Sequence, residues 1–225
     1  MTKVSASATF ADLKAPSLAD VRKQCGLFYP QILAHNAPVS IPKRCNTVGC
    51  VRAGPDFYTC IDCFGSQWFC QECIVLRHGE NPLHRIKTWN TYYNCLSPAQ
   101  LADLGLKMKL IHPDGACCPS RIITTVLTVV HTTGIHKICH YLCKCKEGKD
   151  PRHSRTAVRA SGPQLLANRL FPASSLAPRT AFTFDVLTAF DHMNLEGSIN
   201  IKQFCDSIVG MSERDVGMSK EVRHL

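Results

Sequence analysis

A block of cysteine and histidine residues within forty consecutive positions has the composition of a metal site. The stretch YTCIDCFGSQWFCQEC, residues 58–73, contains two C-x-x-C pairs, with single cysteines before it and histidines after it. Tetrahedral zinc takes four such ligands, so the block predicts two zinc ions. The eight predicted ligands are Cys45, Cys50, Cys60, Cys63, Cys70, Cys73, His78 and His84.

The order of these ligands along the chain predicts how they divide between two ions. A tight C-x-x-C turn directs both sulfurs to one metal, and the six residues between the two pairs are too few to enclose anything. Adjacent pairs should therefore serve different ions, as in a cross-brace zinc finger. We assign Cys45, Cys50, Cys70 and Cys73 to one ion and Cys60, Cys63, His78 and His84 to the other.

Such a finger needs little apolar core, because each structural zinc can contribute about 10–16 kcal/mol of folding free energy. Sites made entirely of protein ligands leave no coordination position for water, so we expect no catalysis at either ion.

Composition favours metal over disulfides as the role of these thiols. The chain has 225 residues, of which 45% are hydrophobic and 14 are cysteine. It lacks an apolar run of membrane-spanning length, and its first twenty residues lack the apolar core of a signal peptide. We therefore expect an intracellular protein with no membrane association, whose thiols stay reduced and bind metal. The formal net charge of +9 favours an acidic partner such as nucleic acid.

Outside the finger, the hydrophobic pattern predicts short elements. Residues 1–40 show little periodicity and are expected to be a flexible leader, with at most a short helix broken by Pro16. Ser97 and Pro98 resemble the start of a helix that would run on through Leu101 and Leu106.

Residues 121–143 are rich in β-branched side chains and predict a hairpin that turns near residues 131–134. Three helical segments are expected after residue 163: QLLANRLF, FTFDVLTAFDHM and INIKQFCDSIVGM, the last capped by Ser198 or Asn200.

These elements predict a small, zinc-stabilised α+β protein, with a cross-brace zinc finger followed by a β-hairpin zinc cluster and short C-terminal helices. The predicted divisions are a leader (1–40), a double zinc finger (41–90), a cysteine cluster region with the hairpin and a basic loop (91–162), a helical region (163–212) and a tail (213–225).

A second cysteine cluster is predicted at the open end of the hairpin. Cys143 and Cys145 point to the same side of a strand. With the turn near residues 131–134, position 120 lies about opposite 145, which brings Cys117 and Cys118 close. His112 could complete a site of three cysteines and one histidine. This cluster could therefore hold a third zinc ion. The alternative is that these cysteines are small buried hydrophobes.

His136 suits this cluster less well, because seven residues along a strand separate it from Cys143 by about 23 Å. It is expected to cap or pack the hairpin turn instead.

A basic segment follows the hairpin and could bind phosphate groups. Its alternative role is a solvated loop. The candidate phosphate ligands are Lys144, Lys146, Lys149, Arg152, Arg155 and Arg159.

Several motifs occur in a fixed order along residues 45–210. They are His84-Arg85-Ile86 with Trp89, His112 with Cys118-Pro119, Gly134-Ile135-His136, Cys143-Lys144-Cys145, and Arg169-Leu170-Phe171-Pro172-Ala173. This order resembles the CxC-type cysteine cluster region of KDZ (Kyakuja-Dileera-Zisupton) transposases, known mainly from fungal genomes, together with a ZZ- or B-box-like finger. The chain departs from that pattern at Ile111, where glycine is usual, and at Ser174, where threonine is usual.

The resemblance bears on the site and on function. The family places its cysteine before proline, which favours Cys118 over Cys117. A RING ubiquitin ligase would end on a cysteine pair, whereas this finger ends on two histidines. In the family the RNase H-like catalytic domain lies further downstream, so we expect a chain that is not an enzyme, a truncated or separate transposase-derived module.

Its expected partners are DNA or a transposase, in the nucleus. Asp185, Asp191 and Glu196 are then solvated helix positions rather than catalytic carboxylates.

Two other functions remain open from the sequence. ZZ-like fingers often bind peptide tails, including histone tails, and the chain could be such an adaptor. Its acidic and aromatic candidates are Asp56, Asp62, Glu72, Phe57, Trp68 and Phe69. The other interpretation of Trp68 and Phe69 is that they form the small core of the finger. The chain could also be a degenerate fragment with no present function.

Overall fold

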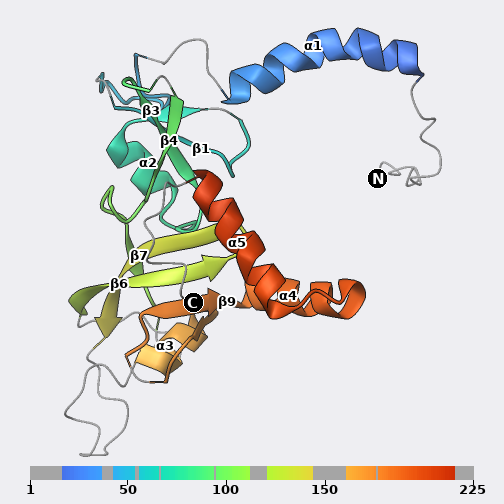
Figure 1. Ribbon diagram of the computed structural model, residues 1–225. Coiled ribbons are helices and arrows are strands. Elements are labelled where there is room, and N and C mark those ends of the chain that lie inside the picture. The colour runs from blue at the N-terminus through green and yellow to red at the C-terminus, as the bar shows by residue number, and fades with distance from the viewer. Residues whose placement is uncertain are drawn as a thin grey trace, which may run out of the picture. The chain divides into compact units, whose positions relative to one another are not determined.

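The structure is a computed structural model of the chain, and it describes eight stretches of residues: 17–36, 43–53, 56–65, 67–93, 95–111, 121–143, 161–175 and 177–215. The chain divides into two compact units, Met1–Ile41 and Pro42–Leu225, which are described separately below (Figure 1). None of the helices in the described part of the chain is long and apolar enough to cross a membrane.

The first unit contains helix α1, Leu18–Asn36. Ser17 caps its start, because the Ser17 hydroxyl accepts a hydrogen bond from the Asp20 amide at 3.2 Å and donates one to the Asp20 carboxylate at 2.6 Å. The helix begins just after Pro16 and continues through Pro30. It is longer than the short helix that the sequence predicted within the leader.

The second unit begins with the predicted finger, whose four strands form an antiparallel sheet in the order β2-β1-β3-β4. Its elements are β1 (Tyr58–Cys60), β2 (Trp68–Phe69), helix α2 (Gln71–Arg77), β3 (Ile86–Asn90) and β4 (Cys95–Ala99). Sheet and helix enclose a small core around Phe57, Trp68, Phe69, Ile74 and Ile86.

Strand β4 occupies the place where the sequence predicted the start of a helix. It pairs with β3 along its whole length, from Ile86 opposite Ala99 to Asn90 opposite Cys95. Pro98 is tolerated because β4 is an edge strand, where a missing N–H costs no ladder hydrogen bond. The helix prediction was therefore wrong. Turns follow the strand, and Leu101 and Leu106 pack into the core of the finger.

A five-stranded sheet forms the next part of the unit, in the order β5-β7-β6-β9-β8. Its strands are β5 (Lys107–Lys109), β6 (Arg121–His131), β7 (Gly134–Cys143), β8 (Leu170–Pro172) and β9 (Thr180–Thr183). The predicted hairpin is confirmed as β6 and β7, with His131 opposite Gly134 across a two-residue turn (Figure 1). One face of the sheet packs against helix α3, Ser161–Ala167, through Leu165.

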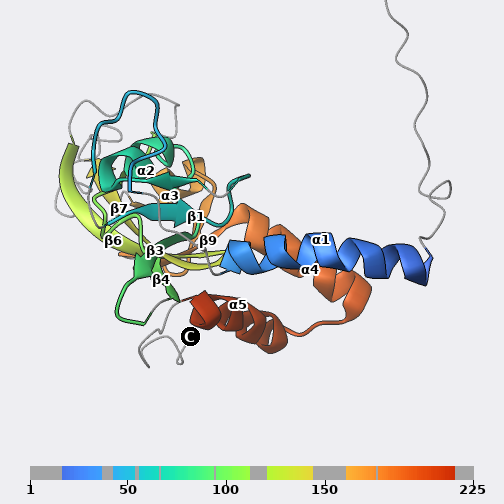
Figure 2. The same ribbon diagram turned by 90° about the horizontal axis from the view of Figure 1, so that it is seen from above.

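Two further helices complete the described chain: α4 (Phe184–Gly197) and α5 (Ile201–Asp215). The Thr183 hydroxyl caps α4 by accepting a hydrogen bond from the Val186 amide at 3.2 Å. Asn200 caps α5 in a reciprocal pair with Gln203, at 2.9 and 3.1 Å. Ser198 instead ends α4 in a left-handed conformation. Both helices were predicted, and Figure 2 shows them joined by their short connection.

The first predicted helical segment, QLLANRLF, is helical only in part. Helix α3 ends at Ala167, and Arg169 turns the chain with a positive φ of 58°. Leu170 then begins strand β8, whose Leu170 lies opposite Thr183 of β9. The sequence therefore located the helix but missed its end, which is set by pairing with a distant strand.

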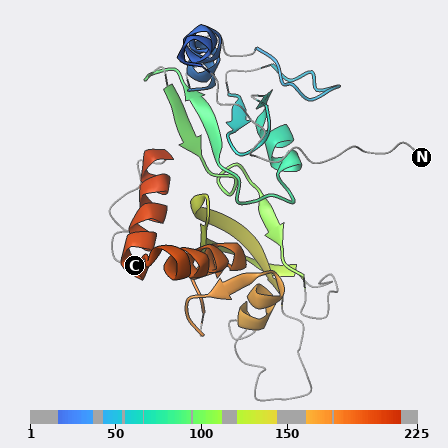
Figure 3. The ribbon, with the colours of Figure 1, turned by 90° about the vertical axis from the view of Figure 1, so that its right-hand side faces the viewer.

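Helix α5 packs on the hairpin at its turn. Two features of the turn require glycine at position 134: its backbone conformation and the close approach of Ser212. Gly134 has a φ of +134°, and a Cβ there would lie 2.8 Å from the Ser212 hydroxyl oxygen. The same hydroxyl accepts a hydrogen bond from the Ile135 amide at 2.7 Å. Figure 3 shows α4 and α5 beside the hairpin.

We expect Gly134→Ala to lower the free energy of unfolding by about 1–3 kcal/mol, because backbone strain and contact with Ser212 act together. Gly210→Ala is the matched control, since Gly210 lies in α5 and an added methyl group there would have nothing within 4 Å. That control should leave stability unchanged or raise it slightly. Urea denaturation measures the free energy of unfolding of both variants. Equal values for the two would contradict the expectation.

Candidate metal centre

The described residues contain two groups of four metal-ligand side chains, and both lie in the finger. Within each group the ligand atoms all lie within 4.8 Å of one another. The groups have the same membership as the assignment made from spacing. They are Cys45, Cys50, Cys70 and Cys73 in one, and Cys60, Cys63, His78 and His84 in the other.

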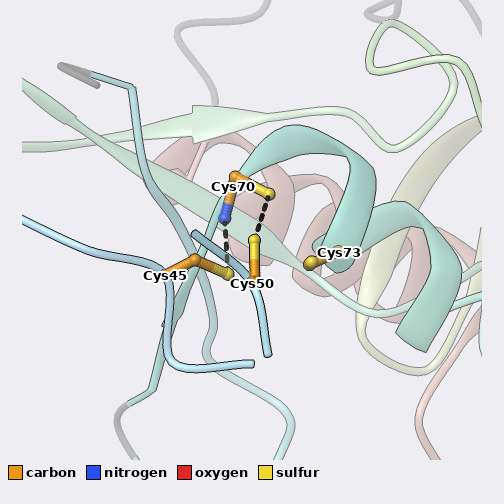
Figure 4. A group of neighbouring side chains, drawn as sticks. All are labelled: Cys45, Cys50, Cys70 and Cys73. Atoms are coloured by element: carbon orange, nitrogen blue, oxygen red, sulfur yellow. Dashed lines mark hydrogen bonds between the residues drawn. The ribbon is translucent and has the colours of Figure 1, made fainter. Parts of the chain in front are cut away.

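The first group consists of four thiols (Figure 4). Cys45 and Cys50 come from the loop before β1, and Cys70 and Cys73 come from the start of α2. The Cys50 and Cys70 sulfurs are 3.9 Å apart. Four sulfurs at about 2.3 Å from a tetrahedral zinc would be about 3.8 Å apart, so this separation suits a shared ion. It is far too long for a disulfide, whose sulfurs are about 2.05 Å apart.

The second group combines two thiols with two imidazoles. The Cys60 and Cys63 sulfurs lie 3.5 and 3.4 Å from His84 Nδ1, and the Cys63 sulfur lies 3.5 Å from His78 Nε2. A tetrahedral zinc with Zn–S of about 2.3 Å and Zn–N of about 2.05 Å puts sulfur and nitrogen about 3.6 Å apart. The donor atoms therefore already have the spacing that zinc requires.

Helix α2 links the two groups. Cys70 is its N-cap and Cys73 lies in its first turn, whereas His78 is its C-cap. Seven helical residues span about 10 Å, so the two ions would be held at opposite ends of one short helix. Ile74, in the middle of that helix, is fully buried in the finger core. The metal sites and the core therefore depend on the same helix.

A hydrogen bond fixes which nitrogen of His78 is available to metal. His78 Nδ1 lies 2.8 Å from the Ile74 carbonyl oxygen, so Nδ1–H donates and Nε2 keeps its lone pair toward Cys63. Burial lowers the pKa of His78, although the Ile74 hydrogen bond opposes this. Both the tautomer and the neutral charge suit a metal ligand.

An ion pair joins the knuckle of the second group to the segment that carries His84. The Arg85 guanidinium contacts the Asp62 carboxylate at 2.6 and 3.1 Å, and the Arg85 amide also donates to it at 2.6 Å. Burial alone would raise the pKa of the Asp62 carboxyl, but the hydrogen bonds from Arg85 outweigh it and hold the pKa below its usual range. Asp62 therefore stays ionised. It lies between Cys60 and Cys63 in the sequence, and it binds Arg85, the residue after His84. The sequence did not lead us to predict this pair. The features that could have indicated it are a carboxylate inside a C-x-x-C pair and an arginine next to a predicted metal ligand.

Without metal, Cys60 and Cys73 resist ionisation, whereas at Cys45 burial is outweighed by hydrogen bonds from Thr47 and from the Cys70 amide, which lower the pKa to about 6. Burial raises the pKa of Cys60 to about 12. At Cys73 the Thr47 hydroxyl favours the thiolate, but burial and the neighbouring thiols outweigh it and raise the pKa to about 12. The Thr47 hydroxyl is buried without a hydrogen-bond partner of good geometry in the described structure, so it is placed to donate to a thiolate once a cation is bound. The two donor sets, four sulfurs and two sulfurs with two nitrogens, fit structural zinc.

Most of the candidate peptide-binding residues already make contacts within the finger. Phe57, Trp68 and Phe69 are 2, 7 and 4% exposed, so these aromatic side chains form the core, as the simpler interpretation predicted for Trp68 and Phe69. Of the acidic candidates, Asp62 binds Arg85, and Glu72 pairs with Arg52 at 2.6 Å. Asp56 is exposed.

Most of the second predicted cluster lies outside the described residues, including His112, Cys118 and Cys145. Cys143 ends strand β7 opposite Arg121, and its side chain is not described. The hairpin register agrees to within one residue with the expected pairing of positions 120 and 145. The six basic candidates, Lys144, Lys146, Lys149, Arg152, Arg155 and Arg159, are also outside the described residues.

His136 lies at the hairpin turn, away from Cys143. Its Nε2 is 2.9 Å from the Thr133 hydroxyl, which in turn donates to the Leu83 carbonyl at 3.2 Å. Burial lowers the pKa of His136 to about 4, so it is neutral at physiological pH. It therefore packs the turn, as expected, and connects it to the segment before His84.

Zinc binding should release protons, because Cys60 and Cys73 are protonated at pH 7 before metal binds. We expect the release of at least two protons per chain and a fall in zinc affinity as pH falls. Calorimetric titration in buffers of different ionisation enthalpy measures the release. A binding heat that is the same in all buffers would contradict the expectation.

Asp62→Asn should weaken the binding of one of the two zinc ions by about tenfold, because the knuckle loses its charged anchor to Arg85. Glu72→Gln removes a carboxylate of the finger that pairs only at the exposed surface, and it should change the binding of neither ion. Competition with a chromophoric chelator measures both affinities. Unchanged zinc binding by Asp62→Asn would show that the ion pair does not position the site.

The chain matches a known protein family over about half of its length. The profile of the family described as CxC2 like cysteine cluster associated with KDZ transposases matches residues 101–215. No curated protein and no solved structure showed a significant match. The matched region begins at Leu101 in the core of the finger and ends at the last residue of α5. The chain belongs to the family of CxC2-like cysteine cluster proteins associated with KDZ transposases.

Proposed function

We propose that this protein is a non-catalytic, zinc-stabilised module of the KDZ transposase-associated family, and that it contacts nucleic acid. The observation that carries the proposal is the pair of four-ligand groups in the finger, whose donor spacing fits zinc, in a chain of this family. Each group would fill a tetrahedral coordination sphere with protein atoms, so zinc would hold the fold rather than activate water.

The placement of the C-terminal carboxylates also supports a non-catalytic role. Asp185 and Glu196 are eleven residues apart in α4, about 16 Å along the helix axis. Two-metal phosphoryl transfer needs carboxylates on ions about 4 Å apart. Asp185 instead lies 3.1 Å from Arg169, in an exposed ion pair. These residues serve as solvated helix positions.

A nucleic-acid partner is supported by charge. The chain carries 26 basic against 17 acidic side chains. Phosphate contacts depend on such an excess and give binding that is largely independent of sequence. The basic segment from Lys144 to Arg159 adds six cations within sixteen positions. A nuclear location follows from this partner and is part of the proposal.

Peptide capture by the finger has less support. Its aromatic candidates are buried in the core, and two of its three acidic candidates are paired with arginine. A peptide tail would find Asp56 exposed, but would lack an open aromatic surface from Phe57, Trp68 or Phe69.

Fluorescence anisotropy with labelled DNA over a salt series tests the proposal. We expect the logarithm of the affinity to fall linearly with the logarithm of salt concentration, and binding to be lost after zinc removal. Replacing Lys144, Lys146 and Lys149 with Gln should reduce the slope if this segment makes the contact. Binding of histone-tail peptides by a protein with no measurable DNA affinity would overturn the proposal in favour of an adaptor.

A further inference from the structure

One part of the five-stranded sheet presents an open, basic surface, which we call the lysine face. It consists of side chains that share one side of β5, β7 and β6: Lys107, Lys109, Lys137, Cys139, Tyr141, Val126 and Thr128. Strand alternation puts them together, because Lys107 pairs with Cys139, Cys139 with Val126, and Lys137 with Thr128. The Lys107 ammonium lies over the Tyr141 ring, 5.9 Å from its centroid, which agrees with both side chains lying on the same side of the sheet.

Other elements cover neighbouring parts of the sheet. The opposite side holds Leu127, Val129 and Ile138, which pack against Leu165 of α3. On the side of the lysine face, Val130 and Ile135 near the turn are covered by Ile208 of α5. Among the described side chains, the open area therefore runs from the Thr128–Lys137 pair to Tyr141.

Three of the exposed side chains of the lysine face are cationic. Lys107, Lys109 and Lys137 are exposed, and Val126 is 60% exposed. The five strands of the sheet contain no aspartate or glutamate in their combined length. A sheet face with three exposed cations and no acidic neighbour in its own strands is complementary to a polyanion.

Its geometry suits a single nucleic-acid strand. Lys107 and Lys109 are two residues apart on one strand, about 6.6 Å, and Lys137 extends the charges to the next strand. Tyr141 is half-buried opposite Lys109, two positions from Cys139, which pairs with the exposed Val126. Proteins that bind single strands combine a row of cations along the backbone with an aromatic ring on which a base stacks. A row of lysines alone would serve any polyanion, and the tyrosine is what favours a nucleic acid.

We propose that the lysine face binds the backbone of single-stranded nucleic acid, with Lys107, Lys109 and Lys137 on phosphates and Tyr141 stacked on a base. The inference rests on the proposed nucleic-acid partner and assigns it a surface built by the sheet.

A charge-matched pair of variants of the full chain tests this surface. One variant replaces Lys107, Lys109 and Lys137 with Gln. The control replaces Lys23, Lys43 and Lys202 with Gln; these lysines are exposed and lie outside the sheet. Both lose three charges, so a difference between them reports location rather than net charge. Thermal melting and zinc content verify that each variant folds.

With a labelled single-stranded 20-mer, we expect the sheet variant to lose at least about tenfold in affinity and to reduce the salt slope by about 2, as three lost phosphate contacts require. The control should change affinity less than about threefold. Tyr141→Phe should bind like the wild type, and Tyr141→Leu should bind about tenfold more weakly, because stacking needs the ring.

The outcomes separate this inference from the proposed function. If the wild type binds and both triple variants bind equally, the lysine face is wrong and the nucleic-acid partner stands. If the wild type binds no nucleic acid, the proposed function itself fails. If a duplex binds as tightly as the single strand and Tyr141→Leu has no effect, the single-strand assignment is wrong. If poly-glutamate competes as effectively as the unlabelled 20-mer, the result would indicate an acidic protein partner instead.

Discussion

The arrangement of this finger depends on one constraint: eight thiol and imidazole groups must be held close together around two points. Without a cation, burial at Cys60, and burial together with neighbouring thiols at Cys73, raise the pKa and oppose formation of the thiolates that bind metal. A divalent ion reverses that cost, because it replaces protons and draws the ligands inward. Helix α2 has only seven residues and would not persist alone in water. Ligands at both of its ends and Ile74 in its middle hold it in place.

The finger and the long hairpin are in contact at the hairpin turn. Thr133 reaches the Leu83 carbonyl next to His84, and Gly134 allows Ser212 of α5 to approach from the other direction. His136 completes the turn as a neutral, buried imidazole. The motif Gly134-Ile135-His136 therefore has a physical explanation in three parts: a backbone conformation, an amide that meets Ser212, and a side chain that supports Thr133.

The sequence was most informative where chemistry is local. Ligand order predicted the two groups, because knuckle geometry depends on residues three apart, and the stretch rich in β-branched residues predicted the hairpin and its turn. It failed where distant pairing decides the outcome. Ser97-Pro98 has good helix-start residues, yet pairing with β3 makes it an edge strand. The Asp62–Arg85 pair joins residues 23 positions apart, and Ser212 meets the hairpin turn from a helix near the end of the described chain. No local pattern encodes such contacts.

The central claim is that zinc, rather than apolar burial alone, holds the finger together. The most direct measurement combines zinc content of the purified chain with hydrogen exchange during EDTA titration. The account predicts at least two zinc ions per chain, and loss of amide protection in α2 and in β1 and β3 as zinc is removed. A chain that contains no zinc, or whose finger amides remain protected after chelation, would contradict it.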